Sequence, residues 1–283
     1  MEDLKKLKPS KVGCGTLFNC KCQDFMDNEA ATNLVSIARN PMLITDPPYG
    51  IDVAKHGTVG GNKLFGSDKS TSKAKAKATD YGAQEWDNET PAVSLLVDMI
   101  SLSSDALIFG ANYFLSSIVK AMNIAERSCA LMKSNKILRN FKTPRRDSID
   151  LFIKNNPKGW VVWDKDNGDN NFNDFELAFT TFDIDSVIIK YRWNGMLQED
   201  MRYKENRFHP TQKPKSLFEE IYQQVIKQFE PTLIFDPYSG SGTIAAIAER
   251  YEIKWIAIEM QEIFCSKSKA RITEESNSLF KFF

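Results

Sequence analysis

Residues 232–260 read TLIFDPYSGSGTIAAIAERYEIKWIAIEM, and their alternation of apolar runs and small residues predicts the architecture of the chain. The apolar run 232–235 is followed by a glycine-rich turn, a helical pattern over 243–251 and a second apolar run at 254–258. A closing helix is expected near 261–275. A strand, turn, helix and strand in this order are typical of a parallel sheet with helices on its faces. We therefore predict one α/β domain of three layers, α/β/α, with a mostly parallel sheet.

The rest of the chain supplies further elements for this sheet, and the whole of 1–283 is predicted to form a single domain. Residues 51–90 are polar and rich in Gly, Ser and Lys, which predicts a mobile loop. Residues 116–158 show only weak apolar periodicity and receive no assignment. Apolar runs predict strands and a period near 3.6 predicts helices. The expected strands are 42–45, 106–109, 159–163 and 186–191, and the expected helices are 91–103 and 214–229.

The composition is that of an ordinary globular protein, with 42% hydrophobic and 26% charged residues among 283. No apolar run of about 18 residues occurs, and no apolar stretch follows the charged N-terminal residues. We therefore expect no membrane span, no signal peptide and a cytoplasmic location. Five cysteines, an odd number, favour reduced thiols, and the cysteine and histidine spacing fits no common zinc site, so no metal is expected.

The glycine-rich turn indicates a ligand site, because small residues let a ligand approach the main chain. It lacks the full dinucleotide fingerprint and has no lysine after its glycines, so neither a nicotinamide site nor a P-loop fits well. Glu259 ends the next strand, 17 residues after Gly242, where a carboxylate can accept hydrogen bonds from both hydroxyls of a ribose. The pattern favours a pocket for an adenosine-bearing cofactor over the alternative, a structural glycine turn.

A second motif, Asp46-Pro47-Pro48-Tyr49, follows the expected strand 42–45. Two prolines fix an extended turn, so the Pro47 carbonyl can point into a site. That carbonyl and the Asp46 carboxylate could accept the two hydrogens of an exocyclic amino group, which frees the nitrogen lone pair for attack on a methyl donor. Tyr49 offers a flat face for stacking on a base removed from the duplex. The alternative is an ordinary turn with Tyr49 packed inward, and the motif alone does not decide.

Together, the two motifs resemble those of the amino-type DNA methyltransferases, which methylate adenine N6 or cytosine N4 with S-adenosyl-L-methionine. The catalytic motif precedes the cofactor motif, an order similar to the circularly permuted beta class and its phage and prophage members. The segment 209–214, His-Pro-Thr-Gln-Lys-Pro, looks like the family segment beside the methionine end of the cofactor. The resemblance covers residues 42 to 260 and implies a Rossmann-like methyltransferase fold.

The resemblance also implies roles for individual residues. It implies that Asp46, Pro47, Pro48 and Tyr49 are catalytic. Aspartate at the first motif position leans toward adenine N6, since the cytosine-N4 enzymes more often have serine there. Cofactor contacts are implied for Asp236, Tyr238, Ser239, Gly240, Gly242, Thr243 and Glu259, with Thr211 and Lys213 nearby.

One stretch departs from the family pattern. Cys20-Lys21-Cys22-Gln23-Asp24 stands where many relatives have Gly-Asp-Cys, with the acid near the cofactor adenine. Lys21 takes the place of that acid unless Asp24 substitutes for it. The contact to the adenine of the cofactor is therefore left open by the sequence.

A basic run without acidic residues predicts DNA contacts on a chain whose formal net charge is zero. The alternative is a solvated surface segment. Regions 116–158 and 182–206 are expected to read the target sequence, while loop 51–90 either closes over the extruded base or is disordered. Trp160 and Trp163 are expected to pack in the core. The residues of the basic run are Lys133, Lys136, Arg139, Lys142, Arg145 and Arg146.

The sequence thus predicts an enzyme, a site-specific DNA methyltransferase that transfers a methyl group from S-adenosyl-L-methionine to adenine N6 in double-stranded DNA. Two alternatives remain open. The same chemistry could act on cytosine N4 or on RNA, or the chain could be a DNA-binding protein with a degenerate cofactor site. A homodimer and a cognate restriction endonuclease are left open as partners.

Overall fold

The computed structural model describes residues 2–51, 87–134, 159–167, 173–194 and 197–279. Within them a nine-stranded sheet runs in the order β1-β2-β11-β10-β3-β4-β6-β5-β7. Its strands are β1 (Pro9–Val12), β2 (Gly15–Phe18), β11 (Lys254–Ile258), β10 (Leu233–Asp236), β3 (Pro41–Thr45), β4 (Asp105–Phe109), β6 (Phe175–Thr180), β5 (Trp160–Asp164) and β7 (Val187–Lys190). A separate two-stranded sheet joins β8 (Trp193–Asn194) to β9 (Leu197–Gln198).

The strands β2, β11, β10, β3 and β4 run parallel, which confirms the predicted mostly parallel sheet. Strands β5 and β6 form an antiparallel hairpin, and β6 also pairs antiparallel with β4. Strand β7 pairs parallel with β5 and forms the edge of the sheet beside this hairpin. An N-terminal hairpin, β1–β2, forms the opposite edge and was not predicted from the sequence.

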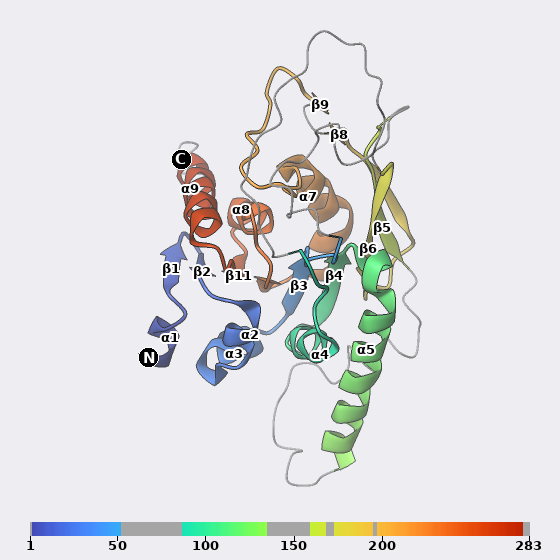
Figure 1. Cartoon of the computed structure of the whole chain (residues 1–283), viewed down its shortest axis with the longest axis vertical. Helices are drawn as coiled ribbons and strands as arrows, with labels where there is room; N and C mark the ends of the chain where they lie inside the picture. Colours follow the sequence, from blue (N-terminus) through green and yellow to red (C-terminus); the bar gives the residue numbers. More distant parts are fainter. Residues whose placement is uncertain (1, 52–86, 135–158, 168–172, 195–196, 280–283) are drawn as a thin grey trace.

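Helices cover both faces of the sheet, so the predicted three layers are confirmed (Figure 1). Alternating side chains of β3 show the two cores, because Met42 and Ile44 pack into one cluster and Leu43 into the other. The first cluster contains residues of α7 (Lys215–Ile221), α8 (Thr243–Arg250) and α9 (Glu262–Leu279). The second contains residues of α2 (Cys22–Met26), α3 (Glu29–Ser36), α4 (Val93–Ser101) and α5 (Ala111–Ser134), with the short α1 (Glu2–Lys5) nearby.

Helix α5 occupies the beginning of the stretch that sequence analysis left unassigned. Its buried residues Ile118, Ala121, Met122 and Ala125 have helical spacing, but exposed apolar residues on the other face dilute the pattern. The helix is kinked at Phe114, whose backbone is non-helical at φ −139° and ψ 30°. The prediction thus missed α5 because its apolar residues are not confined to one side.

The other expected elements agree closely with the structure. The predicted helix 214–229 is α7 continued by a π-helical turn at Tyr222–Ile226 and a 3₁₀ turn at Lys227–Phe229. Trp163 is buried in the core, and Trp160 packs edge-on against Phe179 at its margin. Residues 52–86 of the expected loop lie outside the described residues. None of the helices that the structure describes is long and apolar enough to cross a membrane.

Candidate active site

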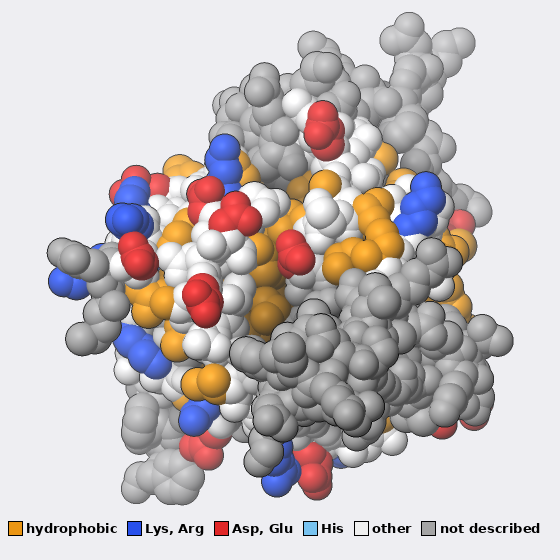
Figure 2. All heavy atoms as spheres, turned by 90° about the horizontal axis from the view of Figure 1, so that it is seen from below, with side chains coloured by type: hydrophobic (Ala, Val, Ile, Leu, Met, Phe, Trp, Pro, Cys, Tyr) orange, Lys and Arg blue, Asp and Glu red, His pale blue; other side chains and the backbone are white. Residues whose placement is uncertain are grey.

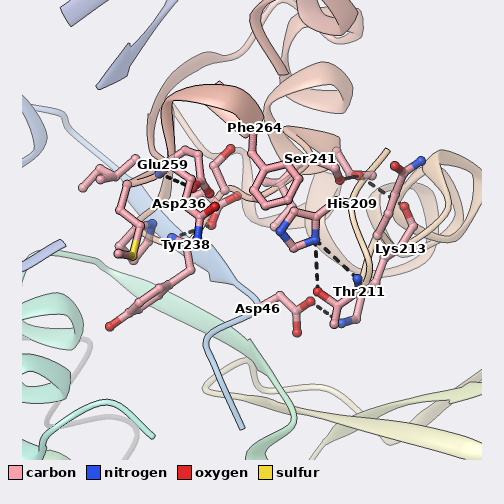
Figure 3. A pocket seen from close by; sticks show the side chains of 18 of the residues that line it. Asp46, His209, Thr211, Lys213, Asp236, Tyr238, Ser241, Glu259 and Phe264 are labelled. Atoms are coloured by element: carbon pink, nitrogen blue, oxygen red, sulfur yellow. Dashed lines mark hydrogen bonds and ion pairs between the residues drawn. The ribbon is translucent and has the colours of Figure 1, made fainter. Parts of the chain in front are cut away.

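The catalytic motif and the glycine-rich turn meet at one pocket (Figure 3). They come together because β3 and β10 are parallel neighbours, so their carboxyl ends lie at the same edge of the sheet. Most of the residues singled out in the sequence line this pocket, while Pro47, Tyr49 and Gly242 adjoin lining residues along the chain. The lining includes Asp46, Pro48, Thr211, Lys213, Asp236, Tyr238, Ser239, Gly240, Thr243 and Glu259.

The glycine-rich turn needs its glycines for backbone geometry. Gly240 and Gly242 have φ values of 51° and 69°, in the left-handed region that side chains disfavour. A Cβ on Gly242 would also lie 2.9 Å from the Cβ of Ser268. The backbone N–H of Ser239 donates to the carbonyl of Ile258 at 2.8 Å, which fixes the turn to the end of β11.

Helix α9 supports this turn from behind. The Ser268 hydroxyl donates to the Gly240 carbonyl at 2.6 Å. The buried Arg271 guanidinium donates to the Ser241 carbonyl at 3.1 Å and to the Thr243 hydroxyl oxygen at 2.8 Å. Sequence analysis missed both supporting residues, because no motif marks a polar side chain on a distant helix.

Two buried polar atoms of the turn have no hydrogen-bond partner among the described residues. Asp236 Oδ1 accepts hydrogen bonds from the Thr45 hydroxyl at 3.0 Å and the Tyr238 N–H at 3.2 Å. Asp236 Oδ2 and the Ser239 hydroxyl are buried and have no partner among the described residues. Burial raises the pKa of Asp236 to about 8. Buried polar groups in native proteins are normally paired, so these two atoms indicate a place for a polar ligand.

Glu259 lies at the end of β11, as its spacing from Gly242 predicted. Its carboxylate accepts a hydrogen bond from the Gln261 N–H at 2.6 Å and lines the same pocket as Asp236. Burial raises the pKa of Glu259 to about 7. The carboxylate can accept further hydrogen bonds. Because its pKa lies near neutral pH, its charge can change when a ligand binds.

The segment before α7 closes a second side of the pocket. The His209 ring packs edge-on against Phe264 of α9, with centroids 4.4 Å apart, and its Nδ1 contacts the Thr211 hydroxyl at 3.2 Å (Figure 3). Burial, together with the positive charge of Lys213, lowers the pKa of His209 to about 3. His209 is therefore a neutral wall residue that sequence analysis did not assign to the pocket.

The sequence left open whether Lys21 or Asp24 lies beside the adenine of the cofactor. In the structure, two cysteines of the same stretch line the pocket instead. Cys20 and Cys22 line the pocket, whereas Lys21 and Asp24 are exposed and do not line it. Burial raises the pKa of each of these two thiols to about 12, so both are neutral. An acidic contact to a ligand at this wall is therefore not provided by Asp24 in this structure.

The catalytic motif presents a carboxylate that is already held on both oxygens. The Tyr49 hydroxyl donates to Asp46 Oδ1 at 2.5 Å, and Lys213 Nζ donates to Asp46 Oδ2. Lys213 is only 6% exposed. Burial raises the pKa of Asp46, against the opposing effect of the Lys213 ammonium. Lys213, expected beside the cofactor, thus contacts the Asp46 carboxylate.

Tyr113 covers one face of the Tyr49 ring. The two rings stack with centroids 5.0 Å apart and planes at 14°. A Cβ on Gly110 would fall 1.9 Å from a ring carbon of Tyr49, so this glycine is required for close packing. Buried Asp87 fixes the turn by accepting hydrogen bonds from the backbone N–H groups of Tyr49 at 2.8 Å and Gly50 at 3.3 Å.

Comparison with known proteins places this pocket in a family context. The family model described as DNA methylase, of N6/N4 type, matches residues 182–270. Over this part, the chain is similar to the N6/N4 DNA methylases. The matched part contains the segment before α7, the glycine-rich turn and Glu259.

Individual relatives are similar over comparable lengths. Type II methyltransferase M2.DpnII of Streptococcus pneumoniae is 31% identical over 94 residues, which are 33% of this chain and 34% of that protein. Type II methyltransferase M2.LlaDCHI of Lactococcus lactis subsp. cremoris is 27% identical over 114 residues, 40% of this chain and 41% of that protein. The match thus spans well under half the length of these curated relatives.

A solved structure, that of the M1.HpyAVI–SAM complex, is similar over 91% of this chain and 98% of its own, with 14% identity and a TM-score of 0.49. The N6/N4 match lies in the C-terminal half, and the catalytic turn at the end of β3 lies outside it. The assignment of Asp46 therefore depends on its place in the pocket.

The expected DNA-contact residues are not tested by the structure. Lys133 belongs to α5, but the structure does not describe its side chain. The other five residues of the basic run lie outside the described residues: Lys136, Arg139, Lys142, Arg145 and Arg146. On the described part of the face shown in Figure 2, basic and acidic side chains are interspersed. Among the described residues, no group of three or more His, Cys, Asp and Glu side chains is placed to hold a metal ion.

Proposed function

We propose that this protein is an S-adenosyl-L-methionine-dependent DNA methyltransferase that acts on an exocyclic amino group, with adenine N6 as its target. The observation that carries the proposal is the junction of two chemistries in one pocket. A buried carboxylate, Asp46, lies at one end, and a glycine-rich turn with unpaired polar atoms lies at the other. The match of residues 182–270 to the N6/N4 DNA methylases supports it.

The pocket residues fit the proposed cofactor in charge and hydrogen-bonding type. Glu259 would accept hydrogen bonds from the ribose hydroxyls, and Asp236 Oδ2 would accept one from the ammonium of the methionine part. The Ser239 hydroxyl and the backbone of Gly240 add polar contacts at a place where side chains are small. When bound, the cofactor supplies a methyl group on a sulfonium, whose departure as a thioether requires no acid.

Asp46 would act on the amino group of the base. Its carboxylate has about four acceptor positions, of which Tyr49 and Lys213 use two, so it can still accept an N–H. That hydrogen bond localises the nitrogen lone pair, which is otherwise delocalised into the ring. A bound cofactor would supply the methyl carbon to this nitrogen and keep the sulfur as a thioether, and the proton lost from nitrogen would pass to Asp46 or to solvent.

The choice of adenine rests on one residue. Aspartate at the first position of the motif is more common among the N6-adenine enzymes that the chain resembles than among the N4-cytosine enzymes. The pocket itself offers a carboxylate acceptor that suits either amino group. Cytosine N4 and RNA are therefore outcomes of the test.

The test uses unmethylated genomic DNA, because the recognition sequence is unknown. The full chain is incubated with the DNA and tritiated S-adenosyl-L-methionine, and the nucleosides are separated after digestion. Tritiated N6-methyladenine is expected, whereas N4-methylcytosine alone would overturn the choice of base. Total RNA serves as the second substrate. A different outcome is that neither DNA nor RNA is methylated and the cofactor does not raise the melting temperature of the protein. In that case the pocket assignment is wrong and a DNA-binding role takes its place.

A further inference from the structure

A buried ion-pair network extends from Asp46 to a part of the chain outside the family match. Lys213 Nζ, which contacts Asp46, also lies 3.2 Å from Glu176 Oε2. Glu176 Oε1 lies 2.5 Å from Lys165 Nζ. The side chains of Asp46, Glu176 and Lys165 are between 16% and 19% exposed. Asp46, Lys213, Glu176 and Lys165 thus form a series of four charges of alternating sign that begins at the pocket.

The antiparallel direction of β6 places Glu176 in this network. Parallel strands bring their carboxyl ends to the pocket edge, but β6 runs the opposite way and so brings its first residues there. Glu176 pairs in register with Trp163, and Lys165 directly follows the end of β5. The β5–β6 hairpin thus places the Glu176 carboxylate and the Lys165 ammonium close to Asp46, which lies at the end of β3.

The order of the charges has a consequence for the proposed reaction. The target nitrogen becomes positively charged as it accepts the methyl group, so the transition state is stabilised by nearby negative charge. Lys213 alone would cancel the charge of Asp46. Glu176 offsets the positive charge of Lys213 beside Asp46, while Lys165, which pairs with the other carboxylate oxygen of Glu176, brings the charge of the four side chains to zero.

The ionisation states agree with this picture. Burial tends to raise the pKa of Glu176, but the ammonium groups of Lys213 and Lys165 outweigh it and hold the pKa at about 2. Burial tends to lower the pKa of Lys213, but Asp46 and Glu176 outweigh it and raise the value. Among the described residues, Tyr49 also contacts Asp46, and Asp236 interacts with it electrostatically across the pocket.

We infer that Glu176 is a positioning residue of the methyl-transfer site, which holds Lys213 and offsets its positive charge, so that the negative charge of Asp46 is not cancelled where the base amino group reacts. The inference rests on the proposed function. It adds to that function a residue from β6 that neither the catalytic nor the cofactor motif contains. Glu176 acts through Lys213 and Asp46 and has no contact with substrate assigned to it.

The test compares Glu176→Gln with wild type in methyl transfer to genomic DNA. Glutamine keeps the shape and can still accept from Lys213, so the fold is expected to persist. We expect kcat to fall roughly tenfold or more, since a unit charge is removed close to the reacting nitrogen. The dissociation constant for S-adenosyl-L-methionine, measured by calorimetry, is expected to stay within about twofold of wild type. Glu219→Gln is the matched control, a glutamate that pairs with Arg250 at 2.9 Å and does not line the pocket.

Two further readouts separate positioning from simple structural damage. The negative charge of Glu176 raises the pKa of Asp46, so the acidic limb of kcat/KM should move to lower pH in Glu176→Gln. In Glu176→Gln, Lys165 loses its charged partner, so the double variant Glu176→Gln/Lys165→Met removes this lysine as well. The double variant should keep both the low kcat and the shift of the acidic limb of kcat/KM to lower pH. Recovery of wild-type kcat in the double variant, or an unmoved limb, overturns the inference. Inactive wild-type protein would instead overturn the proposed function.

Discussion

The two turns that form the pocket differ in how their polar groups are satisfied. At the glycine-rich turn, Asp236 Oδ2 and the Ser239 hydroxyl have no partner among the described residues. At the catalytic turn, both oxygens of Asp46 already accept hydrogen bonds, and the lysine that donates one of them is itself paired with Glu176. One turn has buried polar atoms without partners, whereas the carboxylate of the other is already held in place by two hydrogen bonds before a ligand arrives.

This difference separates binding from rate. An unpaired buried polar group destabilises a protein by about 1–3 kcal/mol, and a ligand that pairs it recovers that energy as affinity. A preorganised carboxylate contributes little to ground-state binding and acts where charge develops in the transition state. Changes at the glycine-rich turn should therefore appear in the dissociation constant of the cofactor, and changes at the catalytic turn in kcat.

The largest expected effect is that of Asp46→Ala on kcat. We expect a fall of roughly a thousandfold or more, because the acceptor for the amino hydrogen is lost. Lys213 keeps Glu176 as a partner, so the variant should fold, and cofactor affinity measured by calorimetry should change less than about threefold. Asp98→Asn on α4 is the control. Activity above about a tenth of wild type in Asp46→Ala would place the catalytic acceptor elsewhere.

Lys213→Met should show that the catalytic turn depends on mutual pairing. The substitution leaves Asp46 and Glu176 as buried carboxylates without their shared cation, which should lower unfolding free energy by about 3–5 kcal/mol at pH 8. Without Lys213 the folded pKa values rise above the unfolded ones, so stability is lost as pH rises and regained toward pH 5. Urea unfolding at both pH values measures this. Lys215→Met, in a more exposed ion pair, should lose about 1 kcal/mol or less, and an equal loss for Lys213→Met at both pH values would contradict the pairing.

The opposite sign is expected for Asp236→Asn at the glycine-rich turn. The folded pKa of Asp236 is about 8, above the unfolded value of about 4, so its destabilising effect is absent below pH 4, grows with pH and is full above pH 8. Removing the charge should raise unfolding free energy of the ligand-free protein by about 1–3 kcal/mol at pH 8.5 and by less at pH 5. Thermal unfolding with and without cofactor checks this, since the variant should lose most cofactor stabilisation. A variant less stable than wild type at pH 8.5 would remove the contrast between the turns.

The smallest expected effect is the pH dependence of cofactor affinity. The pKa of Glu259 is about 7, and its ionised form accepts ribose hydroxyls better, so binding should release protons. Between pH 6 and 8, affinity for S-adenosyl-L-methionine should rise by up to about tenfold per pH unit for each carboxyl group that loses a proton on binding. Glu259→Gln should bind more weakly and flatten the part of the curve due to this group. Calorimetry in buffers of different ionisation enthalpy counts the protons, and no proton release would contradict the raised pKa.

Much of the site could be predicted because it lies in short local motifs. The strand and turn around Asp46, the Gly240–Gly242 turn and the spacing to Glu259 follow from residue types within a few positions. Neighbouring strands in a parallel sheet then bring these motifs to one edge without further information. The three-layer architecture follows from the same repeating pattern of strands and helices.

The remaining contacts could not be predicted, because they join distant residues of unremarkable type. Glu176 is one acid in a strand, and its role depends on the antiparallel direction of β6. Arg271 reaches the glycine-rich turn from α9, and Asp87 fixes the turn at Tyr49 from 38 positions further along the chain. Tyr113 lies on Tyr49 because of the close approach that Gly110 permits. Each of these contacts needs tertiary geometry that sequence spacing does not contain.

The strand order also has a consequence for how the protein is made. Strands β2 and β3 are synthesised early, but they are not neighbours, because β11 and β10 lie between them. Until the ribosome has produced residues 233–258, one edge of each of these two strands has no correct partner. Such long-range pairing slows folding and prolongs exposure to aggregation. Because the glycine-rich turn lies within the same residues, a growing chain cannot form its ligand pocket before residues 233–258 have been synthesised.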